Sequence, residues 1–249
     1  MSESLKDKVA VVTGASNGIG AATARSLAAA GARVVICYNR GAERAQQVLG
    51  SLAGSGHRLQ QIVLEDSTTL KRAAQDVRDT YGRCDILINS ASFTRPVPHA
   101  DLDGLTDELM DSVLIANVRG PFATIRAFAP LLRESGDAVI VNVSSIAGFN
   151  GAGSSIAYAA SKAALDTMTM SLARVLGPEV RIMCVSPGAV NTDFVPGRTL
   201  EAIQKASAQA PLKRVIEPAD VARTIMGCVL YLKETTGTKI VCDGGRFLV

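Results

Sequence analysis

The sequence predicts one α/β domain of three layers, in which a parallel sheet lies between two layers of helices. Apolar runs of strand length recur along the chain and alternate with segments of helical length. They occupy residues 9–12, 33–37, 59–64, 85–88, 138–143, 181–185 and 239–242. Strands that alternate with helices form right-handed βαβ units, which cover both faces of a parallel sheet with helices. We therefore expect a doubly wound fold of the Rossmann type with a seven-stranded sheet.

The composition bounds the size of the protein and the classes of partner that it can have. The chain has 249 residues, of which 47% are hydrophobic and 20% are charged, as is typical of a globular domain with one large core. We therefore assign residues 1–249 to a single domain. The formal net charge is +3 without any block of lysine or arginine, which gives no case for binding nucleic acid or a membrane surface.

The cysteines and the N-terminal residues bear on metal binding and localisation. The five cysteines are scattered, with no CxxC pair and no histidine at ligand spacing, so we expect reduced thiols and no metal site. The first residues are polar, and no apolar run approaches the roughly 18 residues of a membrane span. The expected location is the cytoplasm.

A glycine-rich turn follows the first apolar run. Gly14, Gly18 and Gly20 are spaced as TGxxxGxG, and an alanine-rich helical segment then extends to Gly31. Glycines let the backbone approach a phosphate, and a helix N-terminus presents unpaired N–H groups and the positive end of a dipole. A tight strand-to-helix turn without a ligand is the alternative, because the spacing is looser than GxGxxG. We expect a dinucleotide cofactor at this turn.

The end of the second apolar run indicates which dinucleotide is bound. An acidic residue at this place accepts hydrogen bonds from the ribose hydroxyls and repels a 2′-phosphate. Here the chain has Tyr38, Asn39 and Arg40, with no acid and one guanidinium. A solvated loop charge is the alternative role for Arg40. The missing acid favours NADP(H) over NAD(H).

A tyrosine and a lysine stand at helical spacing later in the chain. Tyr158 and Lys162 fall within the predicted helix 157–176, for which Ser154 or Ser155 is the expected N-cap. Residues four apart share one face of a helix. An adjacent ammonium favours the phenolate, so Lys162 is expected to lower the pKa of Tyr158 toward working pH. An ordinary surface pair is the alternative, and the glycine- and serine-rich loop before the helix favours catalysis.

Together these motifs resemble those of the short-chain dehydrogenase/reductase family, and of its 3-oxoacyl-carrier-protein reductase-like members. The resemblance covers essentially the whole chain. Its motifs, in the order of the family, are Thr13-Gly14 with Gly18 and Gly20, Asp66, Asn89-Ser90-Ala91-Ser92, Asn117, Ser145, Tyr158, Lys162, Pro187-Gly188 and Thr192. The resemblance implies an NAD(P)-binding domain. It also implies four catalytic residues, which are Asn117, Ser145, Tyr158 and Lys162.

The resemblance further implies the contacts to the cofactor. The implied residues are Gly14, Ser16, Asn17, Gly18, Ile19, Gly20, Tyr38, Asn39, Arg40, Asp66, Ser67, Asn89, Ser90, Ala91, Tyr158, Lys162, Pro187, Gly188, Val190 and Thr192. For Asp66 a helix N-cap is a second role, compatible with the first. Asn17 argues against NADP(H), since many NADP-using members have a basic residue there. A small substrate lobe is expected around residues 193–211.

The implied activity is that of a carbonyl reductase, an NADP(H)-dependent oxidoreductase that interconverts a ketone and a secondary alcohol. Tyr158 would be the proton donor or acceptor for a small-molecule substrate, and no metal is required. The resemblance also points to a homotetramer. The C-terminal strand and the apolar helical segment 225–232 are expected at one interface.

Three alternatives remain. A 3-oxoacyl-carrier-protein reductase needs basic residues near its entrance, and the end of the Tyr158 helix, Gly177-Pro178-Glu179, is not basic. A pteridine-type reductase is suggested by Ser92, which stands where the family usually has glycine. A non-catalytic dinucleotide-sensing protein is disfavoured because all four catalytic positions are filled.

Overall fold

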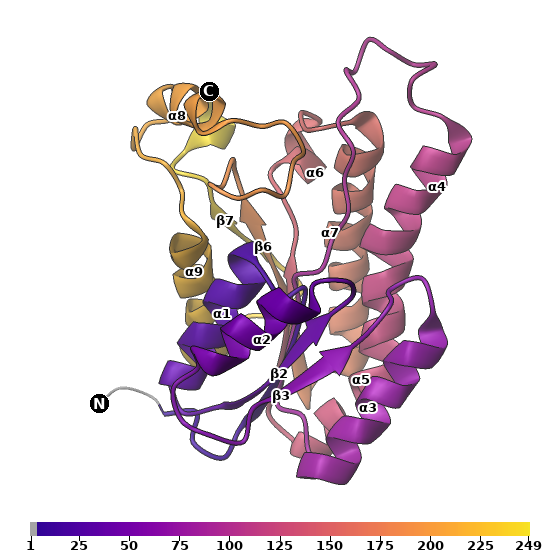
Figure 1. The fold of residues 1–249 in the computed structure, drawn as a ribbon, viewed down its shortest axis with the longest axis vertical. Coiled ribbons are helices and arrows are strands. Elements are labelled where there is room, and N and C mark those ends of the chain that lie inside the picture. The colour runs from indigo at the N-terminus through magenta and orange to yellow at the C-terminus, as the bar shows by residue number, and fades with distance from the viewer. Residues whose placement is uncertain (1–3) are drawn as a thin grey trace.

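The computed structural model describes residues 4–249 and contains one seven-stranded sheet (Figure 1). Every pair of neighbouring strands is parallel, and the strand order is β3-β2-β1-β4-β5-β6-β7. The strands are β1 (Val9–Thr13), β2 (Arg33–Tyr38), β3 (Arg58–Gln61), β4 (Ile86–Asn89), β5 (Ala138–Val143), β6 (Val180–Pro187) and β7 (Lys239–Cys242). The predicted doubly wound α/β fold is confirmed.

Helices cover both faces of the sheet (Figure 1). They are α1 (Gly18–Ala29), α2 (Ala42–Gly50), α3 (Ser67–Tyr81), α4 (Asp107–Leu114), α5 (Gly120–Ser135), α6 (Ala147–Asn150), α7 (Ile156–Leu176), α8 (Leu200–Ala208) and α9 (Pro218–Leu230). Successive residues of a strand point to opposite faces. Accordingly Ala10 and Val12 of β1 pack in a cluster with α1, α2 and α9, whereas Val9 and Val11 pack in another with α3, α5 and α7. The central strands are therefore buried on both sides.

Strand β3 is shorter than its apolar run predicts. The run continues to Leu64, but the strand ends at Gln61 on the edge of the sheet. The chain then turns toward α3, because the Thr69 hydroxyl accepts a hydrogen bond from the N–H of Val63 at 2.9 Å. This side-chain contact satisfies the N–H of Val63 where the chain leaves the edge of the sheet.

The helical segment that begins at Asp107 is interrupted by a π-helical turn. The turn, Ile115–Arg119, joins α4 to α5 and contains Asn117, which is buried. Single π-helical turns are rare and occur often at functional sites. The interruption therefore lies at the one residue of this helix that the sequence analysis assigned to catalysis.

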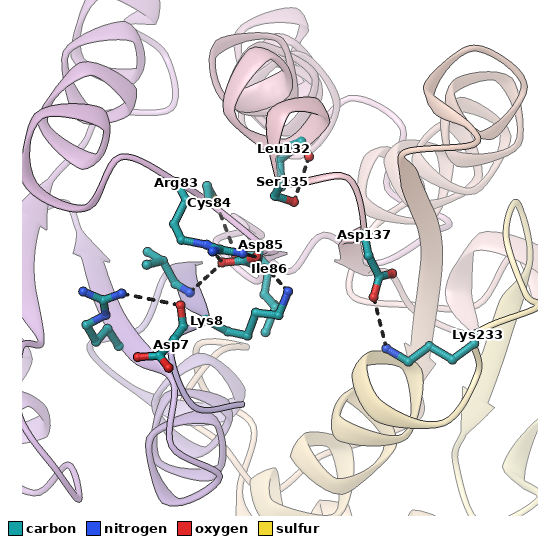
Figure 2. A network of polar contacts seen from close by, with 12 residues as sticks. Asp7, Lys8, Arg83, Cys84, Asp85, Ile86, Leu132, Ser135, Asp137 and Lys233 are labelled. Carbon is teal, nitrogen blue, oxygen red and sulfur yellow. Dashed lines mark hydrogen bonds and ion pairs between the residues drawn. The ribbon is translucent and has the colours of Figure 1, made fainter. Parts of the chain in front are cut away.

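An ion-pair cluster lies at the amino-terminal ends of the central strands β1 and β4, whereas α1 and α7 begin near the carboxyl ends of the strands. Lys8 before β1 and Arg83 before β4 both converge on Asp85 (Figure 2). The Asp85 carboxylate also accepts the N–H of Val9 at 2.9 Å. Within residues 4–249 no helix is long and apolar enough to cross a membrane.

Candidate active site

A cavity of about 1410 Å³ opens at the carboxyl ends of the central strands. The loops after β1, β2, β4, β5 and β6 all contribute to its lining. The strand order reverses between β1 and β4, and crevices at such a reversal are where open parallel sheets bind ligands. The fold therefore creates the site that the glycine-rich turn predicted.

The glycine-rich turn is packed so closely that side chains do not fit. Gly14 has φ +65°, and a Cβ added there would lie 2.8 Å from the Cα of Ala91. A Cβ on Gly20 would lie 2.4 Å from the carbonyl oxygen of Gly14. The Thr13 hydroxyl accepts the N–H groups of Ser90 and Ala91 at 3.1 and 3.0 Å. The loops after β1 and β4 are thereby held together.

The N-terminus of α1 faces the same cavity. The Asn17 side chain accepts the N–H of Gly18 at 2.8 Å, and Asn17, Gly18 and Ile19 line the cavity. An N-terminus of this kind favours an anionic group, so these residues fit the pyrophosphate of a dinucleotide. The role of Asn17 as a helix cap gives a structural reason for an asparagine at this position.

A second arginine, which the sequence analysis missed, lies beside Arg40. Arg40 and Arg44 both line the cavity after β2. A Cβ on Gly41 would lie 3.0 Å from Nη2 of Arg44 and 3.2 Å from Oγ of Ser16, so these two polar groups come together above Gly41. The signal in the sequence was the spacing, because Arg44 follows Arg40 by four residues at the start of α2.

Three of the expected cofactor residues do not line the cavity. The carboxylate of Asp66 accepts the N–H of Thr68 at 2.8 Å and so caps α3, while Leu64 and Glu65, rather than Asp66 and Ser67, line the cavity. Asn89 is buried and donates a hydrogen bond to Oδ1 of Asn142 at 2.9 Å. The remaining expected cofactor residues all line it.

Ser145, Tyr158 and Lys162 converge in the cavity from β5 and α7. Ser155 caps α7, since its hydroxyl accepts the N–H of Tyr158 at 3.2 Å, and this decides between the two serines considered. Lys162 is only 2% exposed. Its ammonium donates to the carbonyl oxygen of Val143 at 2.9 Å and lies 5.6 Å from the centre of the Tyr158 ring.

The pKa values of this pair are dominated by burial. Burial raises the pKa of Tyr158 to about 12, against a hydrogen bond with Ser145 and the charge of Arg198, which both lower it. Burial lowers the pKa of Lys162 to about 8. That Lys162 lowers the pKa of Tyr158 stays a prediction. The ammonium of Lys162 lies over the ring and is bound to the main chain, and the charge of Arg198 also favours the ionised hydroxyl.

Asn117 connects the loop after β4 to α7. Its amide nitrogen donates to the carbonyl oxygen of Phe93 at 2.9 Å and to the Ser161 hydroxyl at 3.0 Å. Its side-chain oxygen accepts from the Ser92 hydroxyl and from the N–H of Phe93, both at 2.8 Å. The side chain does not line the cavity. In this structure it holds Ser161, the residue before Lys162, in place.

The comparison with protein families settles the class of the protein. The family model for short chain dehydrogenases matches residues 8–201, a span that includes the glycine-rich turn and the three residues converging in the cavity. The chain belongs to the short-chain dehydrogenase/reductase family. It is therefore an oxidoreductase of a family that binds a nicotinamide dinucleotide.

Individual relatives of this short-chain dehydrogenase cover almost its whole length. The "Granaticin polyketide synthase putative ketoacyl reductase 2" of Streptomyces violaceoruber is 38% identical, over 97% of this chain and 96% of the relative. The 3-oxoacyl-[acyl-carrier-protein] reductase FabG of Thermotoga maritima is 33% identical, over 97% and 98%. A crystal structure of a short chain dehydrogenase from Burkholderia cenocepacia in complex with NADP has a TM-score of 0.86 and 35% identity, over 97% and 98% of the two chains.

The substrate end of this short-chain dehydrogenase is formed by segments that the sequence analysis placed only roughly. The segment 193–211 contains α8 and contributes Phe194, Arg198 and Ile203 to the lining. The Phe194 ring lies 5.9 Å from that of Tyr158. Arg246, near the end of the chain, joins the same wall. No sequence signal distinguished these residues, because irregular loops bring them to the site.

Proposed function

We propose that the protein is an NADP(H)-dependent oxidoreductase that interconverts a ketone and a secondary alcohol of a small molecule. The observation that carries this proposal is the convergence of Ser145, Tyr158 and Lys162 in the cavity that begins at the glycine-rich turn. A protein that only sensed a dinucleotide would have no use for a buried phenol and ammonium side by side. The proposal also covers a homotetrameric assembly, argued in the Discussion.

The chemistry of the site follows from the arrangement of these side chains. When bound, the cofactor supplies or accepts the hydride. The Tyr158 hydroxyl is placed to give a proton to the carbonyl oxygen, since its raised pKa keeps it protonated at neutral pH. Ser145, bonded to the same hydroxyl, donates a hydrogen bond to that oxygen as negative charge develops. The Lys162 ammonium donates to the carbonyl oxygen of Val143 and lines the cavity, where it would bind the ribose hydroxyls of the cofactor.

The preference for NADP(H) is supported by the polar groups at the end of β2. Arg40 and Arg44 both line the cavity there, and no carboxylate stands among Tyr38, Asn39 and Arg40. Two guanidinium groups suit a 2′-phosphate because each offers paired donors in a planar arrangement. The relative from Burkholderia cenocepacia, crystallised with NADP, points the same way. Among the described residues that line the cavity, the acids are Glu65, just before the α3 cap, and Asp193, at the substrate end.

The second candidate is a 3-oxoacyl thioester reductase. The names of the two curated relatives favour it, since one is a ketoacyl reductase and the other a 3-oxoacyl-carrier-protein reductase. The same three side chains would act on such a substrate. The two candidates differ in what the entrance must accommodate, which is a bulky acidic carrier protein in the one case and a free small molecule in the other.

Oxidation of NADPH separates these candidates. The purified enzyme is assayed with a panel of small ketones, an acetoacetyl thioester and a dihydropterin, and Tyr158→Phe serves as the matched control that keeps the ring and removes the hydroxyl. Turnover of a ketone that Tyr158→Phe lowers by about three orders of magnitude or more, with NADPH still bound, supports the proposal. Turnover restricted to the thioester selects the second candidate. Turnover that survives in Tyr158→Phe overturns the mechanism.

A further inference from the structure

Arg198 occupies a position in the cavity that the reaction described above does not use. It lies between β6 and α8, directly after the Gly197 turn, and its N–H donates to the carbonyl oxygen of Val195 at 3.1 Å. It lines the same wall as Tyr158 and Phe194. The positively charged group is thereby brought to the end of the cavity where the carbonyl of the substrate is reduced.

The guanidinium of Arg198 is half-buried without a protein partner. Within residues 4–249 it forms no hydrogen bond and no ion pair with another side chain or a carbonyl group. Burial lowers its pKa, and the neighbouring Tyr158, which is protonated at neutral pH, supplies no counter-charge. By contrast Arg181, also half-buried, donates to the carbonyl oxygens of Cys228 and Leu232. A half-buried cation without a partner is costly, and a ligand anion offsets that cost.

Within residues 4–249 no acidic side chain pairs with Arg198. Lys162 is engaged by Val143, and Arg246 adds a second half-buried guanidinium to the lining of the cavity. Asp193 also lines the cavity, but its side chain is exposed and does not pair with Arg198. The wall that receives the substrate therefore favours an anion close to the reacting oxygen.

We infer that Arg198 binds a carboxylate of the substrate, and that the enzyme acts on a 2- or 3-oxo acid rather than on a neutral ketone. The carbonyl oxygen would contact Tyr158 and Ser145 while the carboxylate, one or two carbons away, pairs with Arg198 in a bidentate manner. The remaining lining of this end, from Phe93, Phe194 and Ile203, suits an apolar chain on the other side of the carbonyl. This inference rests on the proposed function.

The inference also separates the two candidate reactions. A 3-oxoacyl thioester is neutral on both sides of its carbonyl, so it would leave Arg198 without a partner at the reacting end. A free oxo acid provides that partner. The charge of the substrate is therefore the property to vary, with its size and its carbonyl kept the same.

Acetoacetate and methyl acetoacetate form such a pair, and kcat/KM for each is measured with NADPH. The wild-type enzyme is expected to prefer acetoacetate by about tenfold or more, and Arg198→Met to lower kcat/KM for acetoacetate by about 10- to 100-fold while changing that for the ester by less than about threefold. Arg95→Met is the matched control, because Arg95 is exposed and does not line the cavity. An equal loss for both substrates, or a preference of the wild type for the ester, overturns the inference.

A binding measurement distinguishes failure of this inference from failure of the proposed function. Butyrate and butyramide, which cannot be reduced, are titrated into the enzyme with NADP⁺ by calorimetry. Binding of butyrate that is lost in Arg198→Met, with butyramide unchanged, supports the anion site even if no ketone is turned over. Reduction of the ester together with butyrate binding that is equal in wild type and Arg198→Met retains the oxidoreductase and rejects the anion site.

Discussion

The hydroxyl of Ser92 donates a hydrogen bond to the side-chain oxygen of Asn117 at 2.8 Å. Ser92 stands where the resemblance predicted glycine, so this bond is an addition of the present chain. The same oxygen accepts the N–H of Phe93, and the Asn117 amide bonds Phe93 and Ser161. Ser92 therefore adds one contact to a side chain that already joins the loop after β4 to α7.

Ser92→Ala and Asn117→Ala are expected to differ in their effects on stability. Ser92→Ala removes one hydrogen bond and leaves Asn117 bonded to Phe93, which costs about 1 kcal/mol of unfolding free energy. Asn117→Ala leaves the Phe93 backbone without its partner, removes one of the two hydrogen bonds of Ser161 and costs about 2–3 kcal/mol. Urea denaturation monitored by circular dichroism measures both. Equal losses for the two variants would show that the hydrogen bonds of Asn117 to Phe93 and Ser161 add no stability beyond its bond with Ser92.

The fold was predictable from the sequence because strand and helix periods and glycine turns are local signals. The seven runs all became strands, and Ser155, Gly14 and Gly20 took the predicted places. Of the two compatible roles predicted for Asp66, the structure shows the helix cap, and the residue is not among those that line the cavity.

The electrostatics of the site could not be predicted, because they depend on long-range packing. The spacing of Tyr158 and Lys162 is a local property, but the burial that governs both pKa values comes from the sheet and from segment 193–211. Arg44 and Arg198 reach the cavity from elements whose relative position no local pattern encodes. Spacing thus identified the reacting groups, whereas the groups that select cofactor and substrate required the three-dimensional arrangement.

Lys162 is expected to make stability depend on pH. Its pKa is lowered from 10.5 to about 8 on folding, so between these values the unfolded chain binds more protons than the folded one, and stability rises as pH increases. Lys162→Met abolishes this contribution. We take the unfolding free energy of the variant minus that of wild type. This difference should be more positive at pH 7 than at pH 10 by on the order of 1–3 kcal/mol.

Urea unfolding of wild type and Lys162→Met at both pH values measures this difference, and comparing the two proteins cancels the contributions of other groups. A constant difference across the range would contradict a charged, buried Lys162 in the free enzyme.

Arg40 and Arg44 are expected to share the binding of the 2′-phosphate. Arg40→Ala and Arg44→Ala should each weaken NADPH by about tenfold, and the double variant by more, while NADH binding stays unchanged because it lacks the phosphate. Enhancement of NADPH fluorescence on binding gives the Kd. Arg72→Ala, on the exposed face of α3, is the control. Weakening of both cofactors alike would assign these residues to the adenosine or pyrophosphate instead.

The apolar surface near the end of the chain leads us to expect a homotetramer. Val241 of β7, Tyr231 after α9, and Phe247 and Leu248 are all exposed in the single chain. The inward face of α9, including Ile225 and Cys228, is already buried against α1, so only the outer residues remain for an interface. Sedimentation at micromolar concentration should give a tetramer-sized particle, and Val241→Glu a smaller one. A wild-type particle of monomer size would reject the assembly.

Asp85 is expected to stabilise the fold at the amino-terminal ends of strands β1 and β4, which is the end of the sheet opposite to the cavity. Burial raises its pKa, but hydrogen bonds from Arg83, Val9 and Lys8 outweigh this and hold the pKa below its usual value. Asp85→Asn leaves Lys8 and Arg83 without their counter-charge, though both are about one-third exposed, so we expect a loss of about 1–3 kcal/mol at pH 7.

The pH dependence of this loss and a surface pair provide the controls. A carboxylate with a lowered pKa contributes stability above its unfolded pKa, and that stability is lost as pH falls through the folded pKa. The gap between wild type and Asp85→Asn should therefore narrow from pH 7 toward pH 3 in urea unfolding. Glu134→Gln removes the exposed partner of Arg78 and should have a clearly smaller effect at pH 7. Equal losses of unfolding free energy in the two variants would mean that the buried ion pairs of Asp85 contribute no more stability than the surface pair of Arg78 and Glu134.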